Sequence, residues 1–351
     1  MNKEIKIGKL NIGKDPHTMI VAELSANHNG DRSRALEIVH AAAEAGADAV
    51  KLQTYTADTI TIDCDAPCFQ INQGTLWDGT TLYKLYKEAY TPWEWHEDLI
   101  KEANKLGMEC FSSPFDPTSV DFLEQFDVPA YKIASYEIND IPLIRKIARL
   151  HKPMIFATGI AYPEDIELAL KTCREEGNED IILLKCVSSY PTPYSMVNLR
   201  LIPALAEKYE CITGLSDHTM GSTVAVGAVA LGAKMIEKHL TLRRSDGGPD
   251  GAFSMEPAEF AQMVRDIRIL EEALGSDKYE LTDKQKIEHE RSRSLFITRD
   301  VKKGDIITED NVRSIRPGIG LHTKYYDEIL GKRFNADLSK GTPMSFDYID
   351  C

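Results

Sequence analysis

The sequence lacks the features that mark nucleic-acid-binding, membrane and secreted proteins. Acidic residues outnumber basic ones by 55 to 41, and the formal net charge is −14 at pH 7. Because binders of nucleic acids or anionic membranes need a basic face, we expect neither partner. No apolar run approaches the length of a membrane span, and residues 1–13 lack the apolar stretch of a signal peptide. We therefore expect a cytoplasmic protein, in which an anionic substrate requires a locally cationic pocket.

The chain also has no pair of cysteines at the C-x-x-C spacing of redox and zinc motifs. The number of cysteines is odd, and several of them, such as Cys110 and Cys186, stand within apolar runs. We predict buried free thiols rather than disulfides or a zinc site. The seven cysteines are Cys64, Cys68, Cys110, Cys173, Cys186, Cys211 and Cys351.

From residue 19 onward, short apolar runs rich in β-branched residues alternate with longer amphipathic segments. This alternation predicts repeated parallel βαβ units, with glycines such as Gly46 and Gly107 ending the helices. The predicted strands are Met19–Leu24, Ala47–Leu52, Met108–Ser112, Ala130–Ile133, Met154–Thr158, Ile181–Cys186, Cys211–Leu215 and Met235–Lys238. The predicted helices are Arg34–Ala45, Pro92–Leu106, Ile141–Leu150, Pro163–Glu176, Thr223–Leu231 and Pro257–Leu274.

Eight repeats within roughly 250 residues fit a closed (β/α)₈ TIM barrel, with an open doubly wound sheet as the alternative. No glycine-rich fingerprint follows the first strand, where Ser25–Gly30 reads Ser-Ala-Asn-His-Asn-Gly, and this disfavours nucleotide binding. We predict a barrel over residues 1–275, a charged linker with some helix over 276–293 and a small β-rich domain over 294–351. A long insertion, Asp65–Thr91, follows the second strand, and loops of this length are usually functional or lids.

Polar and charged residues gather at the carboxyl ends of the predicted strands. One such residue is usually a solvated strand end, but all eight strands ending this way predict an active site at that mouth of the barrel. The residues are Glu23, Lys51, Gln53, Ser113, Lys132, Ser135, Glu137, Thr158, Lys185, Ser188, Tyr190, Ser216, Asp217, His218, Glu237 and His239.

Two kinds of chemistry follow from these residue types. Lysines within apolar strands, together with nearby hydroxyls, suit a pocket for a phosphate and a carboxylate, and a Schiff-base lysine is the rival use. His218 and His239, with Glu23, Asp217 and Glu237 close by, could hold a divalent ion that polarises a carbonyl. We expect manganese, with magnesium or cobalt as alternatives.

Several segments resemble the sialic acid synthase family, and the likeness covers nearly the whole chain. The C-terminal domain, with Arg316-Pro317-Gly318, resembles the antifreeze-like SAF domain of these synthases. The barrel segments that carry the resemblance are Ala22–Gly30, Ala130–Glu137, Tyr190–Pro193, Gly214–Thr219, Glu237–His239 and Gly248–Asp250.

The resemblance implies a transferase that joins phosphoenolpyruvate to an acetamido sugar, in a domain-swapped homodimer in which Arg316 reaches the partner's sugar. It implies that His218 and His239 bind the metal and that they act in catalysis with Glu23 and Glu137. The residues it assigns to phosphoenolpyruvate are Lys51, Ser113, Lys132, Ser135 and Ser216, with Thr158 added as a further substrate contact. The residues it assigns to the sugar and the reaction centre are Glu23, Gln53, Glu137, Tyr190 and Asp250, with Ser188 added as a further substrate contact.

Within the family, the insertion and the segment after it, Leu76–His96, resemble the pseudaminic acid synthases, which implies 2,4-diacetamido-2,4,6-trideoxy-L-altrose as the sugar. Ser188 stands where the sialic acid branch has Asn, and this difference argues against N-acetylmannosamine as the substrate. The alternative within the family is an N-acetylneuraminate or legionaminate synthase. The alternatives from other functional classes are a Schiff-base aldolase or lyase and a non-catalytic sugar-binding protein. Trp93 and Trp95 have a plainer reading, as packing between helix and barrel.

Overall fold

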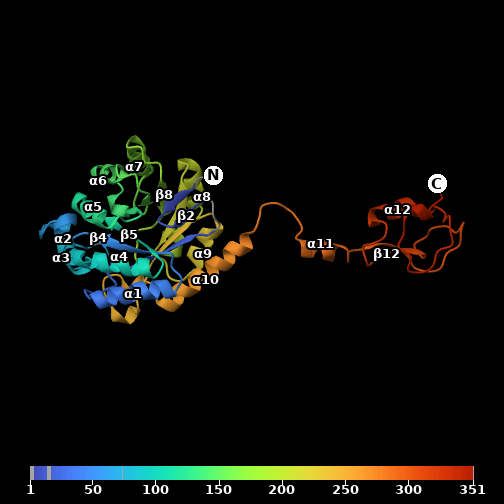
Figure 1. Cartoon of the computed structure of the whole chain (residues 1–351), viewed down its shortest axis with the longest axis horizontal. Coiled ribbons are helices and arrows are strands. Elements are labelled where there is room, and N and C mark those ends of the chain that lie inside the picture. Colours follow the sequence, from blue (N-terminus) through green and yellow to red (C-terminus); the bar gives the residue numbers. More distant parts are fainter. Residues whose placement is uncertain (1–3, 14–16, 73, 351) are drawn as a thin grey trace. The chain divides into compact units, whose positions relative to one another are not determined.

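The computed structural model describes residues 4–13, 17–72 and 74–350, and the chain divides into two compact units, Met1–Gly275 and Ser276–Cys351. In the first unit, eight parallel strands close into a barrel in the order β10-β3-β4-β5-β6-β7-β8-β9, with helices around it (Figure 1). The predicted TIM barrel is therefore confirmed. Its strands are β3 (Met19–Glu23), β4 (Ala49–Thr54), β5 (Glu109–Pro114), β6 (Tyr131–Ile133), β7 (Met154–Ala157), β8 (Ile181–Lys185), β9 (Ile212–Asp217) and β10 (Met235–His239).

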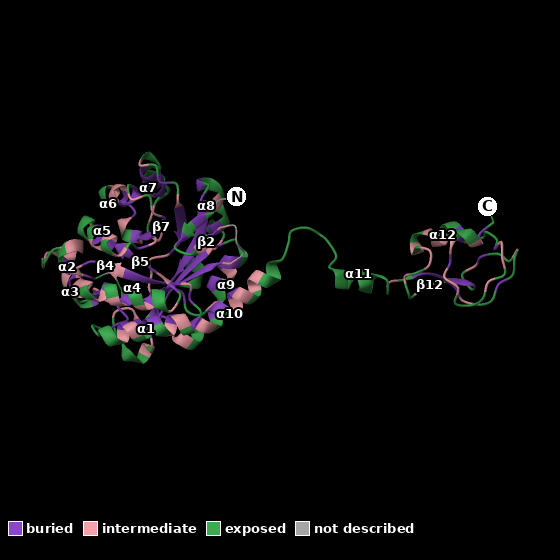
Figure 2. Ribbon diagram, viewed as in Figure 1, coloured by how far each residue is buried: buried purple, intermediate pink, exposed green. Residues whose placement is uncertain are grey.

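The helices that cover the barrel bury one face each (Figure 2). Two short ones, α5 and α8, were not predicted from the sequence, because seven to nine residues give too little periodicity to stand out. The helices are α1 (Arg32–Glu44), α4 (His96–Lys105), α5 (Pro117–Leu123), α6 (Ile141–Ala148), α7 (Pro163–Glu175), α8 (Leu201–Tyr209), α9 (Thr223–Ala230) and α10 (Pro257–Leu274).

The barrel strands alternate between two apolar cores, because successive side chains point to opposite faces of a strand. In β8, Ile181 and Leu183 face the helices, whereas Ile182 and Leu184 fill the barrel. A hairpin of β1 (Ile5–Ile7) and β2 (Leu10–Ile12), which the sequence analysis did not predict, packs its isoleucines against the inner core. The inner core is made from the amino-terminal halves of the strands, so the hairpin closes that end and the other end holds the polar residues.

The insertion after β4 has structure of its own. It follows α2 (Ala57–Ile60), contains a single turn η1 (Pro67–Phe69) and α3 (Leu82–Ala89), and leads through the turn η2 (Trp93–Trp95) into α4. Trp95 packs against the outer core, and Trp93 stacks on Phe122 at 4.6 Å. The plainer reading of these two tryptophans, as packing between helix and barrel, is therefore the correct one.

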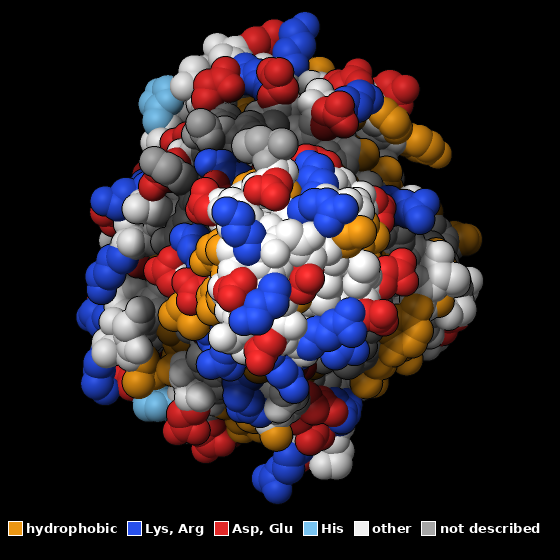
Figure 3. All heavy atoms as spheres, turned by 90° about the vertical axis from the view of Figure 1, so that its right-hand side faces the viewer, with side chains coloured by type: hydrophobic (Ala, Val, Ile, Leu, Met, Phe, Trp, Pro, Cys, Tyr) orange, Lys and Arg blue, Asp and Glu red, His pale blue; other side chains and the backbone are white. Residues whose placement is uncertain are grey.

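The second unit has its own small core around a two-stranded sheet of β11 (Ser294–Ile297) and β12 (Val312–Ile315). Its helix α11 (Asp283–His289) lies in the predicted linker, and all its residues are exposed. The remaining elements are the turn η8 (Thr323–Tyr325), α12 (Tyr326–Ile329) and the turn η9 (Phe346–Tyr348). Acidic and basic side chains are interspersed over the face seen in Figure 3.

Two further expectations can be compared with the described residues. None of their helices is long and apolar enough to cross a membrane. Cys64, Cys68, Cys110, Cys173 and Cys186 are free thiols. Cys110, Cys173, Cys186 and Cys211 are buried, as predicted, whereas Cys64 is half-buried and Cys68 is exposed. Cys351 lies outside the described residues.

Candidate active site

The candidate site lies where the inward-facing positions of the strands change from apolar to polar. In β4, Ala49 belongs to the inner core, and Lys51 and Gln53 follow on the same face. In β10, Met235 belongs to that core, and Glu237 and His239 follow. The same register carries Glu23, Ser113, Lys132 and Ser216.

Buried charges of both signs make the floor of this mouth. The ammonium nitrogen of Lys51 lies 2.6 Å from Glu23 Oε2 and 3.2 Å from Glu237 Oε1, and Lys132 lies 3.6 Å from the same Glu237 oxygen. Ser216 donates a hydrogen bond of 2.9 Å to Glu237. Burial acts to raise the pKa of Glu237, but Lys132 and Lys51 outweigh it and lower the pKa to about 2. Glu237 therefore remains a carboxylate, and its negative charge faces the ammonium groups of both lysines.

Lys51 is one of the two buried lysines of this floor. Burial lowers its pKa to about 8, although the nearby Glu237 carboxylate acts in the opposite direction. Glu23 receives a hydrogen bond of 3.0 Å from the backbone N–H of Ser25 in addition to its ion pair with Lys51. One oxygen of Glu23 thus faces the Lys51 ammonium group, and the other faces a backbone N–H.

Hydroxyl groups surround the lysines. The Ser113 hydroxyl is buried without a hydrogen-bond partner, and buried polar groups rarely stay unpaired unless they serve a ligand or water. Ser135 accepts a hydrogen bond of 3.1 Å from the backbone N–H of Gly159, while Thr158 donates one of 3.1 Å to Leu184 O. The Ser188 side chain lies close to Gly159, since a Cβ on that glycine would lie 2.3 Å from its hydroxyl oxygen. A side chain at position 159 would thus collide with the hydroxyl groups of Ser188 and Ser135.

The two histidines lie next to one another, with ring centroids 5.2 Å apart. His218 Nδ1 lies 3.0 Å from Val187 O, so its Nε2 is the nitrogen left for a ligand. The Nδ1 atom of His239 is buried without a hydrogen-bond partner. Burial, together with His218 and Lys51, lowers the pKa of His239 well below its ordinary value and keeps the imidazole in the neutral form that binds metals.

Two groups expected at the mouth, Asp217 and Lys185, are engaged elsewhere. Asp217 and Lys238 fall on the outward register and form a buried ion pair of 2.7 Å with each other, so Asp217 does not join the histidines. Lys185 is also on the outward register, and its ammonium nitrogen donates to Cys186 O at 2.5 Å. No group of three or more potential metal-binding side chains is preassembled within residues 4–13, 17–72 and 74–350.

Two acids stand above the charged floor. Burial raises the pKa of Glu137 to about 7, and its Oε2 atom has no hydrogen-bond partner. Burial also raises the pKa of Asp250, although the Ser25 hydroxyl and the N–H of Ala26 donate hydrogen bonds to its carboxylate. Gln53 donates to the same Ser25 hydroxyl at 3.2 Å, which links β4 to the loop of Asp250.

An aromatic wall lies on the side of the histidines. The ring of Tyr190 lies 4.4 Å from that of His218, and Phe253 lies 5.0 Å from His239 and 5.1 Å from Tyr190. Trp77, from the insertion, lies 5.5 Å from Tyr190 on its other side. The mouth is thus divided between a charged half and an aromatic half.

Two residues of this mouth were not recognised from the sequence. Ser25 joins Gln53 to Asp250, and only its place directly after the first strand could have pointed to it. Cys186, interpreted as an ordinary buried thiol, lies 3.9 Å from His218 Nδ1 and 3.7 Å from the Ser135 hydroxyl. Burial raises its pKa, but His218 and Lys132 lower it more, to about 7.

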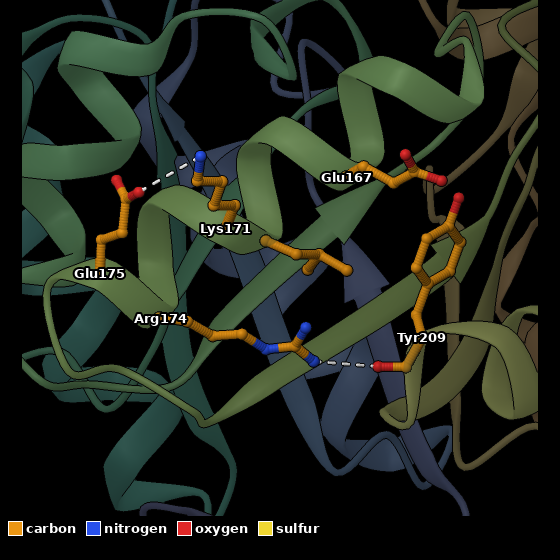
Figure 4. A pocket seen from close by; sticks show the side chains of 6 residues that line it. Glu167, Lys171, Arg174, Glu175 and Tyr209 are labelled. Atoms are coloured by element: carbon orange, nitrogen blue, oxygen red, sulfur yellow. Dashed lines mark hydrogen bonds and ion pairs between the residues drawn. The ribbon is translucent and has the colours of Figure 1, made fainter.

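A groove on the outside of the barrel does not share these properties. It lies between α7 and α8, where Lys171 pairs with Glu175 at 3.6 Å and Arg174 donates to Tyr209 O at 3.0 Å (Figure 4). Its other lining charges are paired as well, Arg174 with Glu179 and Glu167 with Lys208, so we assign it no ligand. Arg316 belongs to the second unit, where it directly follows β12 and is exposed.

Comparison with known proteins identifies the family. The model of the NeuB family matches residues 38–279, and that of the SAF domain matches residues 292–349. The chain belongs to the NeuB family. The resemblance to sialic acid synthases that the motifs indicated is therefore confirmed.

The chain is 46% identical to the pseudaminic acid synthase of Campylobacter jejuni, over 95% of this chain and 97% of that protein. It is 47% identical to the pseudaminic acid synthase of Helicobacter pylori, over 94% and 97%. The N,N'-diacetyllegionaminic acid synthase of Legionella pneumophila is more distant, at 36% over 96% of both chains. The N-acetylneuraminic acid synthetase structure from Leptospira borgpetersenii has a TM-score of 0.73 and 32% identity, over 82% of this chain and 95% of that chain.

The charged floor leads to a prediction about stability. In Glu237→Gln, Lys51 and Lys132 lose the carboxylate between them, and breaking one partner out of a buried ion pair costs about 3–5 kcal/mol. We expect a loss of that order in the free energy of unfolding. Urea titration followed by tryptophan fluorescence reports on the barrel unit alone, because Trp77, Trp93 and Trp95 all lie in it.

The matched control is Glu175→Gln, which removes an exposed carboxylate from Lys171 on α7, outside the barrel. A surface pair of this kind is worth at most about 1 kcal/mol. Equal losses in the two variants would contradict a special role for the charged floor.

Proposed function

We propose that the protein is a pseudaminic acid synthase, which condenses phosphoenolpyruvate with 2,4-diacetamido-2,4,6-trideoxy-L-altrose. The observation that carries this proposal is the identity of 46–47% to pseudaminic acid synthases over nearly the whole of both chains, against 36% to the legionaminate enzyme. In the reaction, C3 of phosphoenolpyruvate forms a bond to the aldehyde carbon of the sugar. Water adds at C2, and phosphate leaves with cleavage of the C2–O bond.

In this proposal the charged half of the mouth binds phosphoenolpyruvate. Lys51 and Lys132 meet its two anionic groups, and Ser113, Ser135 and Ser216 donate hydrogen bonds, with Thr158 at the rim. The unpartnered hydroxyl of Ser113 supports this assignment. Since Glu23 and Glu237 balance the lysines in the free protein, a phosphate entering here must compete with carboxylates for the same ammonium groups.

The pair of His218 and His239 fits a divalent metal. Both imidazoles are buried next to each other, and the buried Nδ1 atom of His239 has no hydrogen-bond partner. A bound divalent ion, with manganese as our choice, supplies Lewis-acid polarisation of the sugar's carbonyl. The two histidines are the only protein ligands that we assign, and the rest of the coordination is left to water and substrate.

The two mouth glutamates have separate roles in our proposal. Glu23 is ion-paired and acts as a fixed negative charge that stabilises positive charge developing at C2. Glu137 has a free oxygen and a pKa of about 7, which suits a general base that removes a proton from the attacking water.

The sugar occupies the aromatic half of the mouth, with Gln53, Ser188, Tyr190 and Asp250 around it. Asp250 and Gln53 are already held in place through Ser25, so they present oriented polar groups. The resemblance that suggested a domain-swapped homodimer also assigns Arg316 of a second copy to this sugar, and we include both in the proposal. We place the reaction in the cytoplasm.

Phosphate release from phosphoenolpyruvate in the presence of manganese tests the proposed function. We expect turnover with 2,4-diacetamido-2,4,6-trideoxy-L-altrose and little with N-acetylmannosamine or 2,4-diacetamido-2,4,6-trideoxy-mannose, because the pocket must match the configuration and the substituents of the sugar. Preference for either manno sugar would move the enzyme to the sialic or legionaminic branch. The absence of phosphate release with all three sugars would reject the reaction class.

The assignment of Glu137 as a base predicts the pH profile. Below about pH 7 this carboxylate takes up a proton and loses its ability to accept one from water, so kcat should fall tenfold per pH unit on the acid side. In Glu137→Gln we expect kcat to be about 10²-fold to 10⁴-fold lower and the acid limb near pH 7 to disappear. An unchanged acid limb in the variant would contradict the assignment.

A further inference from the structure

The insertion contributes one side chain, Trp77, to the mouth, and this contact is specific. Its indole N–H donates a hydrogen bond of 3.0 Å to Pro249 O, although the two residues are 172 positions apart in the sequence. Its ring lies 5.5 Å from that of Tyr190, which also lies 4.4 Å from the ring of His218 and 5.1 Å from that of Phe253. Trp77 therefore joins the insertion to two loops of the mouth, those that follow β8 and β10.

The hydrogen bond determines what Trp77 can offer a substrate. An indole has a single N–H donor and no acceptor, and in Trp77 the carbonyl of Pro249 already takes that donor. The residue is half-buried, so part of the ring remains accessible. What it presents is an apolar, π-rich surface and no polar group.

The order of the groups fixes which end of the sugar this surface meets. In the proposed function the aldehyde binds at His218 and His239, and the charged floor lies deeper in the barrel, because Glu237 precedes His239 on the same face of β10. On this placement the carbon chain runs away from the floor and along Tyr190, whose ring lies 4.4 Å from His218 and 5.5 Å from Trp77. The end of the chain that carries C6 therefore lies farthest from the histidines, at the indole.

We propose that Trp77 is a specificity-determining residue that recognises the methyl-bearing, 6-deoxy end of the sugar. This proposal rests on the proposed function. A methyl group at C6 is buried against the ring without cost, whereas a hydroxyl there loses its water and gains no partner, since the ring has no free donor or acceptor. The substrate class is thus set as sugars that end in CH₃ rather than CH₂OH.

The test compares 2,4-diacetamido-2,4,6-trideoxy-L-altrose with 2,4-diacetamido-2,4-dideoxy-L-altrose, which differs only by the C6 hydroxyl. In the wild-type protein we expect a ratio of kcat/KM that favours the 6-deoxy sugar by about 10-fold to 100-fold. In Trp77→Ala this ratio should fall about tenfold, with an intermediate ratio in Trp77→Phe. The KM for phosphoenolpyruvate should stay within about twofold in both variants, because the ring lies outside the charged half.

Trp93→Phe is the matched control. Trp93 is also half-buried, also donates its indole N–H to a backbone carbonyl, Tyr55 O at 3.1 Å, and also stacks on an aromatic ring, that of Phe122. Phe122 packs against the outer core, on the helix side of the strands, so we expect the sugar ratio to remain at the wild-type value. A change of the ratio in Trp93→Phe equal to that in Trp77→Phe would overturn the proposal.

Two other results separate this proposal from the proposed function. If Trp77→Ala lowers kcat/KM equally for both altrose sugars, Trp77 only stabilises the insertion. The specificity role of Trp77 is then rejected, while the proposed function stands. If the wild type uses N-acetylmannosamine instead, the proposed function fails. The role of Trp77 is then decided by the same ratio measured with N-acetylmannosamine and its 6-deoxy form, where an unchanged ratio in Trp77→Ala overturns it.

Discussion

The mouth of the barrel depends on one constraint, which is that its buried lysines must be neutralised from within the barrel. Lys51 and Lys132 stand on strands, almost completely buried, and Glu237 lies within reach of both, with Glu23 on the far side of Lys51. A buried ammonium group without a partner is costly enough to lose its proton. The carboxylates keep the two ammonium groups charged and in place until an anionic substrate arrives.

The rest of the site follows from the alternation of side chains along a parallel strand. Each inward series begins with apolar residues that fill the barrel and ends with one or two polar residues at the mouth, as from Met235 to Glu237 and His239. The closely packed apolar core beneath holds the polar layer rigidly in place. Above it, loops and the insertion add the aromatic half, so that the strands supply charge and metal ligands while the loops supply the shape of the sugar site.

Much of this arrangement could be predicted from the sequence, because the barrel strands are apolar runs with a polar end and the motifs keep their order. The register rule could have gone further: His239 and Glu237 share a face, so Lys238 must point outward, where it meets Asp217. Other features could not be predicted. Nothing local in Ile5–Ile12 shows that a hairpin closes the barrel, and the hydrogen bond between Trp77 and Pro249 joins segments 172 residues apart. Contacts of this kind depend on tertiary packing, which a single sequence does not display.

The central claim is that the mouth is divided into a charged half for phosphoenolpyruvate and an aromatic half for the sugar. Calorimetric titration of phosphoenolpyruvate alone, without sugar, tests this division most directly in the wild type, Lys132→Met and Tyr190→Phe. The account predicts that Lys132→Met weakens binding at least about tenfold, as expected for the loss of a charged hydrogen bond of 1.5–3 kcal/mol, while Tyr190→Phe binds like the wild type. Unchanged binding in Lys132→Met, or a loss of similar size in Tyr190→Phe, would contradict it.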